Sequence, residues 1–260
     1  MKKLALLFVV VSLATVPTSF AQTRFQQVIE IQVAPVHQQA FENFAMKINE
    51  AADEIESPMS WTMVQVAVGK PEATYRVVLG FDAWAERDQW GTVQSVLTEA
   101  FGEQEAAQIL RAGRGGIVSE TSRIWELLDD GSSNLRADAP MANFYNVQIR
   151  HVSREAVPLY REIQRRWKVA YEEASDGPAV ARWILRYGED AGSVFRRTQP
   201  FDSWAERDSN RGQAILIEHF GEEGRRLQQV AVSRMYEKTE TFVSAYRPDL
   251  SRTASSPTSD

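Results

Sequence analysis

Hydrophobic and polar positions follow two alternating periods along the chain, in a fixed succession. Residues 25–33 alternate with period two, which predicts a strand with one buried face. Pro35 then opens a segment whose apolar residues recur at helical spacing. Two further alternating segments surround a turn at residues 69–72 and predict a hairpin. A helix capped by Asp82 and a final strand complete a β-α-β-β-α-β order, whose later strands we expect at residues 61–68, 75–79 and 123–128.

The same succession returns in the second half of the chain, together with a repeated octamer. Residues 81–88 read Phe-Asp-Ala-Trp-Ala-Glu-Arg-Asp, and residues 201–208 differ from them only at the third position. Residues 101–103, Phe-Gly-Glu, return at residues 220–222, and the spacing of the matches stays at 119 to 120 residues. Colinear matches of this kind predict a tandem duplication of one structural unit.

The octamer has a structural and a functional interpretation. In the structural one, its first Asp caps a helix, its Trp packs on the first turn, and its Glu and Arg lie on the solvated face. In the functional one, Trp84, Glu86, Arg87 and their counterparts surround a pocket. The residue types fit the structural role well, so the octamer identifies the fold better than the function.

The first residues have the three-part layout of a secretory signal peptide. Lys2 and Lys3 precede an apolar stretch that ends at Val16, and small residues at Ser19 and Ala21 precede a cleavage position. The stretch is too short to span a bilayer as a helix. We therefore predict a periplasmic or secreted protein with no stable membrane anchor once the leader is removed. Composition sets the remaining boundaries: signal peptide 1–21, first unit 22–130, linker 131–142, second unit 143–250 and disordered tail 251–260.

Two tandem units of this order and size resemble the dimeric α+β barrel superfamily, which includes antibiotic-biosynthesis monooxygenase-like and NIPSNAP-like proteins. The resemblance implies the α+β fold class. It implies two ferredoxin-like units that pack sheet to sheet, with helices outside, as a pseudo-dimer within one chain. It rests on element order, length and pairing. Because no catalytic signature of a member family is matched, no functional residue is carried over.

If two sheets face each other, the polar face of each strand lines the space between them. We expect apolar side chains to meet the helices, namely Ile29, Ile31, Val64, Val66, Tyr75, Val77, Leu79, Val147, Ile149, Trp183, Leu185 and Phe195. The candidate ligand-binding residues are then Glu30, Gln32, Gln65, Arg76, Asn146, Arg150, Arg182, Arg186 and Arg196, with Met63 and Gln148 on the same faces. A register slip of one residue in the first strand of the second unit exchanges Arg150 for His151.

Charge is divided unevenly between the two units. Residues 22–139 carry a net charge of −9 and residues 140–260 a net charge of +1, and almost all basic residues of the second unit are arginines. Arginine is suited to two-pronged recognition of carboxylate or phosphate. One hypothesis is therefore an anion-binding wall made of Arg150, Arg182, Arg186 and Arg196. In the alternative, these arginines face solvent or pair with acids of the first unit such as Glu30.

Three functional hypotheses remain open from the sequence. The first is an exported binding or interaction protein that holds a small apolar or anionic ligand between its sheets. The second is a cofactor-independent monooxygenase-like enzyme acting on a small organic molecule, with Trp61, Trp183, Asn146 or His151 beside the substrate. The third is haem binding through His151. No catalytic residue is assigned, and the sequence leaves open whether the chain is an enzyme.

Composition narrows the cofactors and partners. The chain has 260 residues, a net charge of −6 and no cysteine, which excludes thiolate metal sites and disulfides. The three histidines lack a metal-binding spacing, so no metal site and no cofactor is predicted. Mild acidity argues against a nucleic-acid partner. A small-molecule ligand is the expected partner, and homo-oligomerisation stays open.

Overall fold

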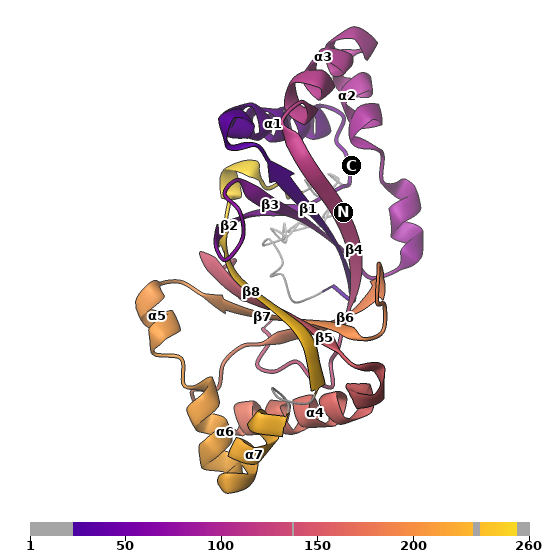
Figure 1. The fold of residues 1–260 in the computed structure, drawn as a ribbon. Coiled ribbons are helices and arrows are strands. Elements are labelled where there is room, and N and C mark those ends of the chain that lie inside the picture. The colour runs from indigo at the N-terminus through magenta and orange to yellow at the C-terminus, as the bar shows by residue number, and fades with distance from the viewer. Residues whose placement is uncertain (1–22, 137, 231–234, 254–260) are drawn as a thin grey trace, which may run out of the picture.

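A computed structural model of the chain describes residues 23–136, 138–230 and 235–253. In these residues the chain forms a mixed α+β structure built on a closed antiparallel barrel of eight strands (Figure 1). The predicted α+β class is thereby confirmed. The expected signal peptide lies outside the described residues, as do residues 254–260 of the expected tail. Within the described part, the helices are all too short or too polar to cross a bilayer.

The first half forms one four-stranded layer with its helices on the outside. Its sheet has the order β2-β3-β1-β4. Its elements are β1 (Phe25–Val33), η1 (Pro35–His37), α1 (Gln38–Glu54), β2 (Thr62–Val68), β3 (Thr74–Phe81), η2 (Trp84–Gln89), α2 (Val93–Phe101), α3 (Glu103–Arg114) and β4 (Ile117–Leu127).

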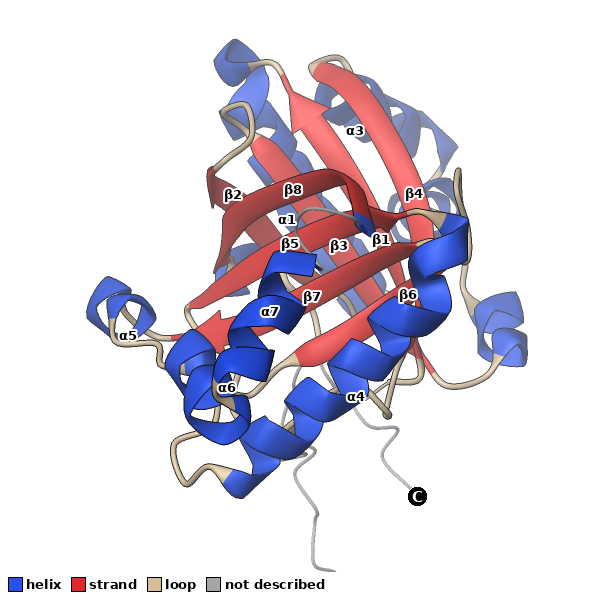
Figure 2. Ribbon diagram, turned by 60° about the horizontal axis from the view of Figure 1, so that its bottom comes forward, coloured by secondary structure: helices blue, strands red, loops and turns tan. Residues whose placement is uncertain are grey.

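The second half has the corresponding sheet order, β6-β7-β5-β8. Helices α4, α6 and α7 lie together on the outer face of this sheet (Figure 2). The elements are β5 (Phe144–Val152), η3 (Arg154–Ala156), α4 (Val157–Glu173), β6 (Ala181–Tyr187), β7 (Val194–Phe201), α5 (Trp204–Asp208), α6 (Gly212–Phe220), α7 (Glu222–Val230), β8 (Tyr236–Tyr246) and η5 (Pro248–Leu250).

The two sheets close on each other through their edge strands. β4 of the first half pairs with β6 of the second, and β2 pairs with β8. Representative partners at these seams are Leu127 with Trp183 and Val64 with Tyr246. Closure leaves neither sheet with an unpaired edge, which removes the usual site of edge-to-edge aggregation.

The long second helix expected in each unit is interrupted. In the first half it is divided into η2, α2 and α3, and Gly102 separates the last two with a φ of 82°. Gly221 has the same place between α6 and α7, with a φ of 58°. Glycine adopts this left-handed conformation without the steric cost that other residues meet.

The repeated octamer joins the same elements in both halves. Phe81 stacks on Phe25 at a centroid distance of 5.3 Å, and Trp84 packs on both rings at 5.4 Å. Phe144 and Phe201 also stack at 5.3 Å, and Trp204 lies 5.5 and 5.8 Å from them. In both copies the Glu of the octamer accepts backbone hydrogen bonds at the helix start. The structural interpretation of the octamer is thereby confirmed for its Trp, but the predicted Asp cap is wrong. The helices begin after Ala83 and Ser203, and Asp82 and Asp202 instead accept hydrogen bonds from the backbone of Arg24 and Asn143.

The residues after β8 pack on the first half of the chain. Leu250 is fully buried in the core around α1, and Arg252 is 6% exposed. Arg252 exchanges backbone hydrogen bonds of 2.9 Å with Trp61, and its guanidinium contacts Asp53 at 2.7 Å. The prediction that disorder begins at residue 251 is wrong for residues 251 and 252. The hydrophobic pattern does not predict the packing of these two residues, because two polar residues in a row carry no periodicity.

The start of the expected linker packs in a similar way on the second half. Ser132 and Ser133 are buried, and Ser133 pairs with Val180 in an isolated bridge. Ser132 also accepts a hydrogen bond of 2.9 Å from the backbone of Arg182. Ser132 and Ser133 thus belong to the folded second half, and the linker begins later than the predicted residue 131.

A carboxylate on α1 binds the chain end to the first half. Glu42 accepts hydrogen bonds from the Tyr75 hydroxyl at 2.5 Å and from Arg247 at 2.8 Å. Arg247 also contacts Asp249 at 2.7 Å. The hydrogen bond from Arg247 is the largest cause that lowers the pKa of Glu42, to about 2. Desolvation raises the pKa of Tyr75, which keeps its hydroxyl a donor.

Glu42 stabilises the fold at neutral pH, and this contribution is lost in acid. A lowered pKa stabilises the fold above the unfolded value of 4.5, and the contribution is lost as the pH falls toward 2. We expect Glu42→Gln to lower the free energy of unfolding at pH 7 by about 2–3 kcal/mol. Urea unfolding from pH 7 to pH 2.5 should show the two proteins converging as the pH falls. Glu50→Gln, at an exposed pair with Lys47, should stay within about 0.5 kcal/mol of the parent. A constant difference at all pH values would contradict the assignment.

Candidate functional site

The space between the two sheets is filled with side chains. Its core consists of residues from both halves, including Val28, Val64, Val78, Trp125, Val147, Ile149, Trp183, Leu185 and Phe242. The cavity that remains among them has a volume of about 30 Å³. That volume accommodates about one water molecule. The deep interior between the sheets therefore has no room for an organic molecule.

Several strand faces are the reverse of those predicted. Val64, Val66, Val147, Ile149, Trp183 and Leu185, all expected under the helices, lie in the barrel interior. Met63 belongs to the helix-side core of the first half. By strand alternation, Gln65, Asn146, Gln148, Arg150, Arg182 and Arg186 share the outer faces, and these predictions are also wrong. The predicted faces of Ile29, Ile31, Tyr75, Val77, Leu79 and Phe195 are confirmed.

The physical reason lies in the burial of both faces of each sheet. The barrel interior requires apolar residues, and the helices cover the outer face as well. Polarity then no longer distinguishes inside from outside. In the second half the polar residues are the ones under the helices, which reverses the usual rule.

Four of the candidate residues do face the barrel interior. Glu30 and Gln32 lie at one mouth, in a polar hollow of about 450 Å³. Glu30 pairs with Lys70 at 2.6 Å and with Arg76 at 3.5 Å. Arg196 lies deeper, with its guanidinium 5.0 Å from the Trp125 ring and 4.7 Å from the Trp183 ring. Burial lowers the pKa of Arg76 to about 10 and that of Arg196 well below its usual value.

The four arginines of the predicted anion-binding wall therefore do not meet. Arg196 lies inside the barrel, and Arg186 forms an exposed pair with Glu126 on the outside. Arg150 and Arg182 lie under the helices of the second half, with Arg197, which the sequence had not singled out. The alternative of an ion pair with an acid of the first unit holds for Arg186, which contacts Glu126. Glu30 pairs instead with Arg76 of its own half.

A large pocket lies in the first half, between the outer face of its sheet and the helices. Its volume is about 1050 Å³. Ile29, Ile31, Val77 and Leu79 form its floor on β1 and β3, and Phe41, Phe44 and Ala45 form a wall on α1. Trp61, Trp84 and Trp90 contribute large aromatic surfaces. Pockets of this size and lining hold small organic molecules.

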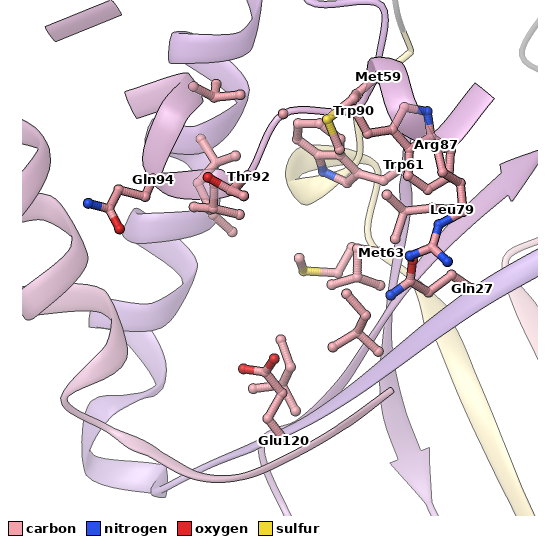
Figure 3. Close-up of a pocket in the computed structure, with 18 of the residues that line it drawn as sticks. Gln27, Met59, Trp61, Met63, Leu79, Arg87, Trp90, Thr92, Gln94 and Glu120 are labelled. Atoms are coloured by element: carbon pink, nitrogen blue, oxygen red, sulfur yellow. The ribbon is translucent and has the colours of Figure 1, made fainter. Parts of the chain in front are cut away.

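The polar groups of the pocket are few and lie at separate places. Figure 3 shows Arg87, Trp61 and Trp90 near one end, Thr92 and Gln94 along the helix side, and Glu120 at the opposite end. Thr92 caps α2 by accepting a hydrogen bond of 3.0 Å from the backbone of Ser95. This cap holds the connection between η2 and α2 in place over the pocket.

Arg87 is the most closely held of these groups. Its guanidinium lies 5.7 Å from the Phe81 ring, 6.0 Å from Trp84 and 5.8 Å from Trp90. It donates a hydrogen bond of 2.9 Å to the side chain of Gln27, and its buried Nε has no partner among the described residues. Trp84 and Arg87 line the pocket, while Glu86 is not among its lining residues, and a functional role for the octamer stays a prediction.

The acidic groups of the pocket are Asp88 and Glu120. Both are exposed, and Glu120 pairs with Arg114 at 3.3 Å. The sequence did not single out Trp90, Thr92 or Glu120. Trp90 could have been found from the sequence because it lies two residues after the octamer. Thr92 and Glu120 carry no such signal, because only the tertiary fold brings them to the pocket.

The described residues lack a group of three or more acids and histidines able to hold a metal ion. The pocket lining contains no histidine. His151 lies instead at the barrel mouth, 3.7 Å from Asp190 and 4.0 Å from Glu240. The residues present in the pocket therefore do not fit a histidine-ligated haem.

The pocket is expected to bind apolar molecules. Val77→Trp fills the floor with an indole ring, so we expect binding of the neutral fluorescent probe N-phenyl-1-naphthylamine to weaken by at least about tenfold, with the melting temperature preserved. Fluorescence titration measures the binding. Val118→Trp, at a position 63% exposed, is the matched control and should bind as the parent does. If Val77→Trp binds the probe as tightly as the parent does, the probe binds outside this pocket.

Comparison with known proteins identifies the fold. No protein-family model and no curated protein matches the chain. Among solved structures, a proposed monooxygenase from Lactobacillus acidophilus has a TM-score of 0.53 at 9% identity, covering 90% of this chain and 97% of that one. An anthrone oxidase-like protein has a TM-score of 0.52 at 12% identity, covering 90% and 95%. A proposed chlorite dismutase has a TM-score of 0.50 at 8% identity, covering 86% and 95%. The chain is thus similar in fold to dimeric α+β barrel proteins.

Proposed function

We propose that the chain is a monooxygenase-like enzyme that acts without a cofactor on a small, largely apolar organic molecule held in the pocket of the first half. The observation that carries the proposal is the pocket of about 1050 Å³, with one partly buried guanidinium among its aromatic rings. The similarity in fold to a proposed monooxygenase and to an anthrone oxidase-like protein supports it. A binding protein with its ligand between the sheets has less support, because the barrel interior is filled.

The chemistry proposed for the pocket converts an activated methylene to a ketone. A substrate R₂CH₂ next to a carbonyl loses a proton to a pocket carboxylate, and the carbanion is stabilised as an enolate. Electron transfer to O₂ and C–O bond formation, followed by return of the proton, give R₂CH–OOH. Loss of water then yields R₂C=O, so that R₂CH₂ and O₂ become R₂C=O and H₂O. O₂ is both the oxidant and the source of the new oxygen atom.

Named residues fit the steps of this reaction. Trp61 and Trp90 would hold an aromatic substrate by ring contacts. Arg87 would hold the enolate oxygen, because its unpartnered Nε is a donor in a site shielded by aromatic rings. Glu120 and Asp88 are the carboxylates of the pocket and the candidate bases.

The test uses anthrone and O₂, with Arg87→Met as the variant. We expect the parent to consume O₂ and form anthraquinone faster than heat-inactivated protein, and Arg87→Met to lower kcat by about 100-fold with a smaller change in KM. The matched control is Arg207→Met at the corresponding position of the second octamer, where the guanidinium lies 5.2 Å from the Trp204 ring. An oxygen electrode and the absorbance of anthraquinone measure turnover. Equal rates for the parent and the heat-inactivated protein would contradict this reaction, and equal rates for Arg87→Met and the parent would contradict the role of Arg87.

We also propose that the chain is a tandem duplicate whose halves form a pseudo-dimer of ferredoxin-like units. The repeated octamer, the matched ring contacts around Trp84 and Trp204, and the corresponding strand orders support this origin. The duplication accounts for the closure of the barrel, because each half supplies one edge strand to each seam.

Export remains a proposal that rests on residues 1–21. Expression of the full chain in a Gram-negative bacterium should yield a periplasmic protein whose first residue is Gln22, because a signal peptidase cuts after Ala21. Mass spectrometry of the periplasmic and cytoplasmic fractions measures this. A full-length chain found only in the cytoplasm would contradict the proposal.

A further inference from the structure

Three arginine side chains gather under the helices of the second half. Arg150 on β5, Arg182 on β6 and Arg197 on β7 form this arginine cluster, and Tyr160 and Tyr171 of α4 lie beside it. Arg182 and Arg197 are direct cross-strand partners on one face of the sheet. Like charges placed opposite each other in a sheet are destabilising.

The cluster has no carboxylate to neutralise it. No acidic side chain of the described residues lies within 4.0 Å of these three guanidinium groups, although 16 other Arg or Lys residues of the described part do form such pairs. Asp260 is the only acidic side chain outside the described part. The hydrogen bonds of the cluster go to neutral acceptors: Arg150 donates to Gln148 at 2.8 Å, Arg197 to Gln199 at 2.6 Å, and Arg182 to the backbone of Gly131.

Several donors in this region have no hydrogen-bond partner among the described residues. They are Nε and Nη1 of Arg150 and Nε and Nη2 of Arg182, whose side chain is 2% exposed, and both amide atoms of Gln164 on α4 lack partners as well. A buried guanidinium with unpaired donors costs several kcal/mol of folding free energy in general. Burial is also the largest cause that lowers the pKa of Arg182, to about 10, and Arg197 lowers it further.

The region is nevertheless reached by solvent. Arg150, Arg197 and Gln148 lie on the helix-covered face of the sheet, yet each keeps a partly accessible side chain. In the first half, Ile31, Met63 and Val77 have the corresponding register positions and line the apolar pocket. The same place in the fold therefore has apolar chemistry in one half and cationic chemistry in the other.

We infer that the arginine cluster is a second ligand site, which binds the carboxylate or phosphate group of a small molecule. Planar guanidinium groups donate paired hydrogen bonds to both kinds of oxyanion. Such a group would neutralise the adjacent Arg182 and Arg197 and accept hydrogen bonds from the unpartnered donors of Arg150 and Arg182. The site is separate from the proposed monooxygenase pocket and does not depend on it.

The test compares anions at one ionic strength. Inorganic phosphate and benzoate are titrated against chloride, with binding measured by calorimetry and the melting temperature by differential scanning. We expect phosphate or benzoate at 100 times its Kd to raise the melting temperature by several degrees more than chloride does. A response to phosphate alone or benzoate alone identifies the oxyanion. Equal effects of all three anions would overturn the proposal.

The position of the anion site is tested by replacing each arginine of the cluster with the residue at the corresponding position of the first half. We expect Arg182→Met and Arg197→Val to keep or raise the melting temperature without anion, since each removes an uncompensated charge, and to lose the anion response. Arg150→Ile provides a third variant if one of these fails to fold. Arg225→Gln, at an exposed pair with Glu222, is the control and should respond as the parent does. A folded Arg182→Met and Arg197→Val protein that keeps the anion response would refute the assignment, as would loss of stability in all three variants without anion.

Discussion

Closure of the barrel is the constraint on which the other features depend. The edge strands of the two sheets pair at β4–β6 and β2–β8. The inner faces of the two sheets therefore pack against each other. Large side chains such as Trp125, Trp183 and Phe242 fill that space. Any organic ligand is therefore restricted to the spaces between a sheet and its helices, or to the mouths of the barrel.

Within this common frame the two halves differ in chemistry more than in shape. Ring contacts around Trp84 and Trp204 hold the same elements together at nearly the same distances. The outer face of the sheet carries Met63 and Val77 in one half and Arg182 and Arg197 in the other. The difference lies in side chains of the outer faces, while the order of the paired strands is the same in both halves.

The sequence predicts the strands and the α+β class, because both depend on local periodicity. It does not predict the faces of β2 in the first half or most strand faces of the second half. Arg150 and Arg182 look solvent-facing beside Ile149 and Trp183, yet both faces of that sheet are covered. It also misses the pocket, because Glu120 and Thr92 are separated from Ile29 along the chain and meet only in the folded molecule. Arg87 could be predicted as a pocket residue, because it belongs to the repeated octamer.

The packing of Leu250 and Arg252 against α1 and Trp61 bears on how the chain folds. The first half cannot complete its core, nor β2 its outer pairing, until the last strand has been synthesised. Contacts between residues about 200 positions apart, such as Glu42 with Arg247, are typical of slow folding. The two halves are therefore not independent folding units. Folding of the first is completed only after the second has left the ribosome, and a chain truncated before residue 247 would lack a wall of its own core.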